Sequence, residues 1–208
     1  MEFWNSLLTE KSWNLLQEIK GKFDFILIGG WASYLWTKTH KSKDIDIIID
    51  LKTLYKIKNE YKLIKNDRLK KYEIKFGEID VDIYVPYYSK LSLPIEGLKN
   101  YFTVVEGFKV VTPEILLILK QGAELDRGNS VKGQKDRIDI MSLLFYSDID
   151  FKKYNEIIKK YNLNYAAELK RIIKGFKDLK HLNTNAKDFK KIKNELLEKT
   201  GNLQAKDL

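Results

Sequence analysis

The chain has 208 residues, with 38 Lys or Arg, 29 Asp or Glu and a formal net charge of +9. This length allows one large domain or two small ones, and an apolar content of 44% argues against a disordered chain. Because cysteine is absent, disulfides, thiol chemistry and Cys-based zinc sites are excluded. The first twenty residues lack the apolar core of a signal peptide, and no run of eighteen apolar residues is present to cross a membrane. We therefore expect a cytoplasmic protein with no membrane partner.

Positive charge is concentrated at the C-terminal end of the chain. Residues 170–208 contain 11 Lys or Arg against 5 Asp or Glu, so six of the nine surplus charges lie there. Such a surface attracts nucleic acid. A lysine-rich proteome or a thermophilic origin explains the same surplus equally well.

Hydrophobic periodicity predicts alternating helices and strands up to residue 112. In chain order we expect a helix at 6–20, a strand at 23–28, a helix at 31–38, a strand at 44–50, a helix at 51–60 capped by Asp50, weaker strands at 61–65 and 72–76, a strand at 78–86, and a hairpin at 101–113 that turns at Glu106-Gly107.

After Pro113 only helical patterns follow, with Pro113 in the first helical turn. The expected helices lie at 113–125, 135–146, 150–161, 164–180 and 186–200, with a loop at 127–134. The sequence thus predicts an α/β core over 1–112 and a helical domain over 113–208. The fold class is α+β: a mixed β-sheet flanked by helices, then a C-terminal helical bundle.

Two aspartates stand at the start of the strand at 44–50. Asp44 and Asp46 are two residues apart, so both side chains leave one face, with Cα atoms about 6–7 Å apart. Carboxylates this close repel each other, and Mg²⁺, which prefers oxygen ligands, would relieve that repulsion. The alternative is a half-exposed strand with polar residues facing water. The unbroken apolar run at 47–49 instead indicates a strand buried on both faces beyond Asp46.

A second pair of acids lies on the strand at 78–86. Asp80 and Asp82 share one face of this strictly alternating segment, together with Glu78. If this strand neighbours the strand at 44–50, three or four carboxylates converge and call for a metal ion. The alternative is an edge strand whose acids face solvent.

The pair Gly29-Gly30 separates a predicted strand from a predicted helix. A helix N-terminus at this point presents free backbone N–H groups that can bind an anion such as phosphate. A tight turn explains the two glycines equally well. The segment is neither a Walker loop nor a G-x-G-x-x-G turn.

Taken together, this order of elements and acids resembles the nucleotidyltransferase superfamily, the fold typified by DNA polymerase beta. The matching residues are Gly29, Gly30, Ser42, Asp44, Asp46 and a third acid, which is Asp82 or, as the alternative, Asp80. The resemblance implies that the glycine turn holds a nucleoside triphosphate, that Asp44 and Asp46 bind Mg²⁺ or Mn²⁺, and that Asp82 helps to activate an acceptor hydroxyl. One departure is His40, where many relatives have an arginine four residues before the first aspartate.

Residues 112–144 further resemble the AbiEii-type and related minimal nucleotidyltransferases. The matching positions are Thr112, Pro113, Glu114, Lys120, Lys135, Asp136 and Asp139. By this analogy Lys120 reaches the triphosphate, while a lysine that extends its ammonium to solvent at a helix end is the alternative. For Arg127, Lys135 and Asp136 a surface salt-bridge cluster is the favoured interpretation.

These features predict a metal-dependent nucleotidyltransferase that moves a nucleoside monophosphate from a triphosphate to a hydroxyl acceptor. RNA, including tRNA, or protein is the favoured acceptor. The argument for RNA is a row of basic residues expected along one helix: Lys170, Arg171, Lys174, Lys177 and Lys180. AbiEii-type relatives are often toxins, which would imply an antitoxin partner. The alternatives are a small-molecule (antibiotic) nucleotidyltransferase, a catalytically silent binding module of the same fold, and, with less support, a metal-dependent phosphohydrolase.

Overall fold

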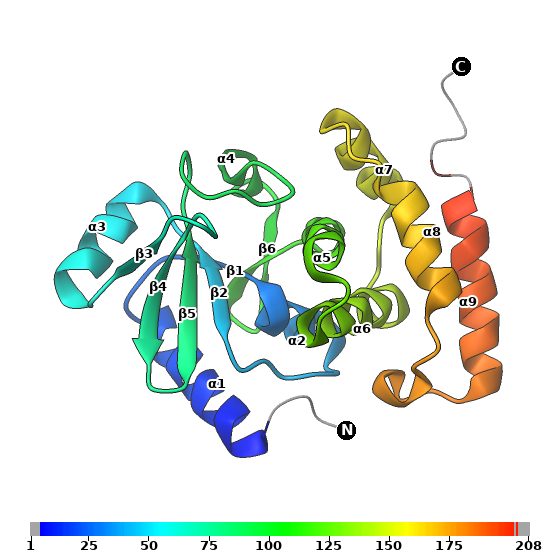
Figure 1. Ribbon diagram of the computed structural model, residues 1–208, viewed down its shortest axis with the longest axis horizontal. Helices are drawn as coiled ribbons and strands as arrows, with labels where there is room; N and C mark the ends of the chain where they lie inside the picture. The colour runs from blue at the N-terminus through cyan, green and yellow to red at the C-terminus, as the bar shows by residue number, and fades with distance from the viewer. Residues whose placement is uncertain (1–4, 202, 204–208) are drawn as a thin grey trace. The chain divides into compact units, whose positions relative to one another are not determined.

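A computed structural model describes residues 5–201 and 203 of the chain (Figure 1). The chain divides between Thr112 and Pro113 into two compact units, an α/β unit and a helical unit. In the described part of the chain, no helix is both long and apolar enough to cross a membrane.

The α/β unit contains seven strands and four helices within the described residues. In chain order they are α1 (Ser6–Lys20), β1 (Ile26–Ile28), α2 (Gly29–Thr37), β2 (Ile45–Ile48), α3 (Leu51–Glu60), β3 (Ile64–Asn66), β4 (Lys71–Phe76), β5 (Ile79–Tyr84), α4 (Ile95–Leu98), β6 (Phe102–Val105) and β7 (Phe108–Val111).

All seven strands form one mixed sheet in the order β3-β4-β5-β2-β1-β7-β6. The pairs β2–β5 and β1–β7 are parallel, and the other four pairs are antiparallel. The predicted α+β class with a mixed sheet is therefore confirmed. The sheet also makes β2 and β5 direct neighbours, so the two strands that carry the aspartate pairs lie side by side (Figure 1).

The helix α2 packs on β1 and β2, and its residues Trp31, Ala32 and Leu35 are buried in the core. Trp31 is fully buried, and its indole N–H donates a hydrogen bond of 2.9 Å to Ser12 on α1. A buried indole N–H without a partner would cost free energy, so this bond fixes α1 against α2. The predicted burial of β2 on both faces is confirmed, because Ile47, Ile48 and Ile49 are all buried.

The predicted helix at 31–38 in fact begins at Gly29, directly after the last residue of β1. The strand before it is also shorter than predicted, since it begins at Ile26 rather than at residue 23. No connecting residue separates strand from helix, which is sterically allowed because Gly29 has a φ of 69° and no Cβ.

The helical unit contains α5 (Pro113–Arg127), α6 (Val131–Tyr146), α7 (Phe151–Lys160), α8 (Tyr165–Gly175), the short 3₁₀ helix η1 (Leu179–Leu182) and α9 (Ala186–Gly201). The predicted loop at 127–134 is wrong beyond residue 130. Ser130 caps α6 by accepting a hydrogen bond of 3.1 Å from the Gly133 N–H, so the helix starts four residues early.

The predicted helix at 164–180 is also wrong in its second half. Phe176 is extended with a φ of −70° and a ψ of 130°, so α8 ends at Gly175. The ammonium of Lys193 on α9 donates to the backbone carbonyls of Lys174 and Phe176, and so satisfies acceptors that the helix end leaves open. The expected row of lysines is therefore interrupted: Lys177 and Lys180 lie outside α8.

Candidate active site

The turn between β1 and α2 brings a helix N-terminus against a carboxylate. A Cβ atom added to Gly29 would lie 2.1 Å from Oδ2 of Asp46 and 2.7 Å from its Cβ. These distances are far below van der Waals contact, so only glycine fits at this position. The first-turn N–H groups of α2, including that of the buried Gly30, lie at this end of the helix, where phosphate binds in many proteins.

Four residues on neighbouring strands are paired in one row across the sheet. Ile28 of β1 pairs with Asp46 of β2, Asp46 pairs with Asp82 of β5, and Asp82 pairs with Glu73 of β4. Neighbouring strands are about 4.8 Å apart, and directly paired residues point to the same face. Asp46, Asp82 and Glu73 therefore form one row of carboxylates that begins beside the glycine turn.

The carboxyl group of Asp82 has an unusual environment. Burial raises its pKa most, the nearby charge of Asp46 raises it further, and Lys71 opposes both, with a result of about 7. Its Oδ2 accepts a bond of 2.5 Å from Lys71, while its buried Oδ1 accepts no hydrogen bond. A buried acceptor left open in this way is costly unless another donor or a cation takes it.

This raised pKa has a defined sign for stability. The unfolded chain releases the Asp82 proton near its ordinary pKa of 3.8, and the folded protein releases it at about 7. Between these pH values the folded state holds more protons, so the free energy of unfolding falls as the pH rises. Ionised Asp82 beside Asp46 thus destabilises the protein at neutral pH, which is common where carboxylates are arranged for function.

Two residues beside Asp82, Lys71 and Glu73, were not predicted from the sequence. Lys71 Nζ lies 2.5 Å from Asp82 Oδ2 and 3.2 Å from Glu73 Oε1. A signal for them did exist: the two-residue turn at Gly77-Glu78 between β4 and β5 fixes the antiparallel register. That register places Glu73 opposite Asp82.

The other predicted site residues lie nearby or along the same strands. Asp44 is half-buried and directly precedes β2, and Ser42 is buried in the segment that leads to it. Asp80 lies two residues from Asp82 toward the Gly77 turn, opposite Lys75, with 3.8 Å between their charged atoms. The structure therefore brings Asp46 and Asp82 side by side and gives Asp80 a separate, more exposed partner.

These residues fit a divalent cation in their chemistry. Two carboxylates stand in direct register, and one buried carboxylate oxygen has no hydrogen bond. Carboxylate oxygens are the ligands that Mg²⁺ and Mn²⁺ use in proteins. Across residues 5–201 and 203, no three His, Asp or Glu side chains are grouped closely enough to hold a metal ion as they stand. Asp82 is turned toward Lys71 instead.

Lys120 and its predicted neighbours lie in the helical unit and are buried together. Lys120 Nζ lies 2.6 Å from Asp139 and 3.4 Å from Asp136, and Asp136 also pairs with Arg127 at 2.7 Å. Lys135 lies 3.6 Å from Asp139. The expectation of a surface cluster is wrong for Lys135 and Asp136, because both are buried; packing of α5 against α6 encloses the charges.

The α/β unit also carries a pocket of about 440 Å³ with a mixed lining. Its residues are Glu10, Trp13, Asn14, Tyr34, Lys38, Lys41 and Glu106. The rings of Trp13 and Tyr34 have centroids 6.3 Å apart, and Lys38 lies over the Tyr34 ring at 5.3 Å. Aromatic faces beside lysines can stack a base and contact a phosphate.

The fold of this chain is similar to that of solved structures. ANT(2″)-Ia in complex with adenylyl-2″-tobramycin matches with a TM-score of 0.51 and 11% identity, over 76% of this chain and 98% of that one. JHP933 from Helicobacter pylori matches with a TM-score of 0.45 and 15% identity, over 96% and 92%. A nucleotidyltransferase-like protein from Paracoccidioides brasiliensis matches with a TM-score of 0.41 and 15% identity, over 78% and 92%.

No model of a known protein family matches this sequence, and no curated protein matches it. At 11% identity, the likeness to ANT(2″)-Ia is one of fold.

Proposed function

We propose that the protein is a metal-dependent nucleotidyltransferase that transfers a nucleoside monophosphate from a nucleoside triphosphate to a hydroxyl group and releases pyrophosphate. The observation that carries this proposal is the contact between Gly29 and Asp46, with Asp82 in direct register. A phosphate held by the α2 N-terminus would lie beside the carboxylates that can hold Mg²⁺. Mg²⁺ or Mn²⁺ would neutralise the triphosphate and stabilise the leaving pyrophosphate.

The acids share one proposed role and differ in another. Asp44, Asp46 and Asp82 are the proposed metal ligands, and Ser42 belongs to the nucleotide side of the site by resemblance. Asp82 is the proposed third acid, which accepts the proton of the acceptor hydroxyl; its register with Asp46 and its raised pKa support this choice. Asp80 is the alternative candidate for the third acid, and it pairs with Lys75 instead.

The test is transfer of label from each α-³²P nucleoside triphosphate, with Mg²⁺ or Mn²⁺, to total RNA, protein or small molecules. The wild type should label one class of acceptor, and Asp44→Asn/Asp46→Asn should label none. Asp82→Asn should lose at least about 100-fold in rate, as for a lost general base, whereas Asp80→Asn should keep most activity. Transfer that survives in Asp44→Asn/Asp46→Asn would refute the proposed site.

RNA is the acceptor that the surface charge favours. Exposed lysines that can contact phosphates lie along and around α8 and α9: Lys174, Lys177, Lys180, Lys187, Lys190 and Lys191. The pocket at Trp13 and Tyr34 can stack a base. Labelled RNA whose yield falls steeply with salt supports this acceptor. In the toxin hypothesis, expression arrests growth only when Asp44 and Asp46 are intact, and a co-expressed antitoxin relieves the arrest.

A small-molecule acceptor is the second candidate, because the neighbour ANT(2″)-Ia is in complex with adenylyl-2″-tobramycin. The same labelling experiment with an aminoglycoside in place of RNA separates the two. A catalytically silent binding module predicts triphosphate or RNA binding without transfer to any acceptor.

A further inference from the structure

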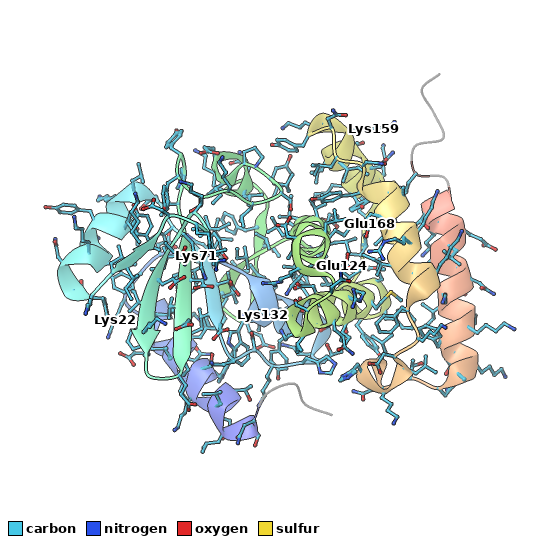
Figure 2. The ribbon with its side chains drawn as sticks, in the orientation of Figure 1. Lys22, Lys71, Glu124, Lys132, Lys159 and Glu168 are labelled. Atoms are coloured by element: carbon cyan, nitrogen blue, oxygen red, sulfur yellow. The ribbon has the colours of Figure 1, made fainter. Side chains whose placement is uncertain are left out.

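Lys71 has an ammonium group placed between two carboxylates of the proposed site. Its Nζ lies 2.5 Å from Oδ2 of Asp82 and 3.2 Å from Oε1 of Glu73, and its side chain is only 12% exposed. Figure 2 labels Lys71 at the start of β4, next to β5. A lysine this buried, in contact with a proposed metal ligand, is part of the site rather than of the solvated surface.

The row of acids explains why a cation is needed there. Asp46 and Asp82 are direct neighbours on parallel strands, and Glu73 continues the row on β4. Three carboxylates on one face of a sheet repel one another when they are ionised. Lys71 is a cation that contacts two members of this row, Asp82 and Glu73.

Glu73 gives Lys71 a second, ready partner. The carboxylate of Glu73 accepts a hydrogen bond of 2.9 Å from Asn66 on β3, so its position is fixed independently of Lys71. Lys71 can therefore release Asp82 and keep its charge paired, by a small movement of a flexible side chain toward Glu73.

We propose that Lys71 is a positioning residue that serves as the internal counter-ion of the acid row: it holds Asp82 in the metal-free protein and moves to Glu73 when a divalent cation takes Asp82. This inference rests on the proposed function for the identity of Asp82 as a metal ligand. In it, Lys71 and the metal ion compete for one carboxylate, so Lys71 weakens metal binding while it stabilises the metal-free protein.

A purely structural ion pair predicts the opposite sign for metal affinity. If Lys71 only held β4 and β5 together, its removal would loosen the acids and weaken metal binding. If Lys71 competes with the metal, its removal strengthens metal binding. The direction of the change therefore separates the two roles.

The experiment is a calorimetric Mn²⁺ titration of the whole chain, with thermal unfolding in EDTA in parallel. Lys71→Met should bind Mn²⁺ about 10- to 100-fold more tightly than the wild type and should melt at a lower temperature in EDTA. Lys71→Arg keeps the cation and should stay within a few-fold of the wild type. Glu73→Gln removes the alternative partner and should weaken Mn²⁺ binding.

The matched control is Lys109→Met. Lys109 on β7 donates to both oxygens of Asp24, at 2.6 and 2.8 Å, but β1 lies between β7 and β2. This variant removes an equally close lysine–carboxylate pair from the same sheet and should leave Mn²⁺ affinity unchanged. If Lys71→Met does not fold, Lys71→Gln carries the same expectation.

Mn²⁺ affinity that is unchanged or weaker in the neutral Lys71 variants overturns the inference. A wild type that binds Mn²⁺ less tightly than Lys71→Met, yet transfers no nucleotide to any acceptor, supports the inference and refutes the proposed function. Nucleotide transfer by the wild type, with equal Mn²⁺ affinity in the wild type and Lys71→Met, supports the proposed function and overturns the inference. No Mn²⁺ binding by any of the proteins overturns both.

Discussion

The contact between Gly29 and Asp46 leads to a sharp prediction for Gly29→Ala. Gly29 has a φ of 69°, and Gly77 has a φ of 61°, so alanine at either position pays about 1–2 kcal/mol for a left-handed backbone. At Gly77 no atom lies within 4 Å of the added Cβ, whereas at Gly29 it would lie 2.7 Å from Asp46 Cβ. Side-chain rotation cannot move that atom away, so the backbone of β1 or β2 must shift, which adds about 1–3 kcal/mol.

Urea unfolding of the wild type, Gly29→Ala and Gly77→Ala measures this difference, and both substitutions lie in the same compact unit. Gly77→Ala should lower the free energy of unfolding by about 1–2 kcal/mol and keep nucleotide transfer. Gly29→Ala should lower it by about 2–5 kcal/mol and lose transfer, because Asp46 is displaced. Equal losses of stability in the two variants, with transfer intact in both, would show that the close approach at Gly29 carries neither stability nor function.

Four further substitutions test other parts of the structure. In EDTA, Asp82→Asn should have nearly the wild-type free energy of unfolding near pH 4. As the pH rises toward 8 it should become more stable than the wild type, because it lacks the carboxyl group whose pKa is about 7. A constant difference in stability across this range would contradict the proposed environment of Asp82. Asp136→Asn should cost about 3 kcal/mol in urea unfolding because Lys120 loses a buried partner, whereas Asp24→Asn, which breaks a surface pair, should cost less than about 1 kcal/mol. Asp50→Ala removes the cap of α3 and should cost about 1 kcal/mol, with the loss of helix visible by circular dichroism.

Much of the site follows from spacing along the chain. Period-two alternation gave the shared face of Asp80 and Asp82, and this pattern of buried and half-buried residues is present in β5. The cap of α3 by Asp50 was predicted and is confirmed at 2.7 Å. These features depend on a few neighbouring residues, which is the range over which a single sequence is informative.

Features that depend on tertiary pairing were harder to predict. Lys71 belongs to a lysine-rich segment, 68–75, that reads as ordinary surface until the register of β4 with β5 places it beside Asp82. The early end of α8 was missed because Phe176 continues the apolar stripe of the helix, although its backbone is extended. The prediction from sequence missed Lys71 because charge alone does not distinguish a buried lysine from a solvated one.

The direct passage from β1 into α2 has a consequence for how this protein can change in evolution. One residue inserted between Ile28 and Gly29 would rotate the whole of α2 by about 100° about its axis if the helix kept its place. Trp31 and Leu35, both buried, would then leave the core. Exposed loops generally tolerate changes in length, but this junction should tolerate neither insertion nor deletion, so the distance along the chain from β1 to Trp31 should be the same in every functional descendant of this sequence.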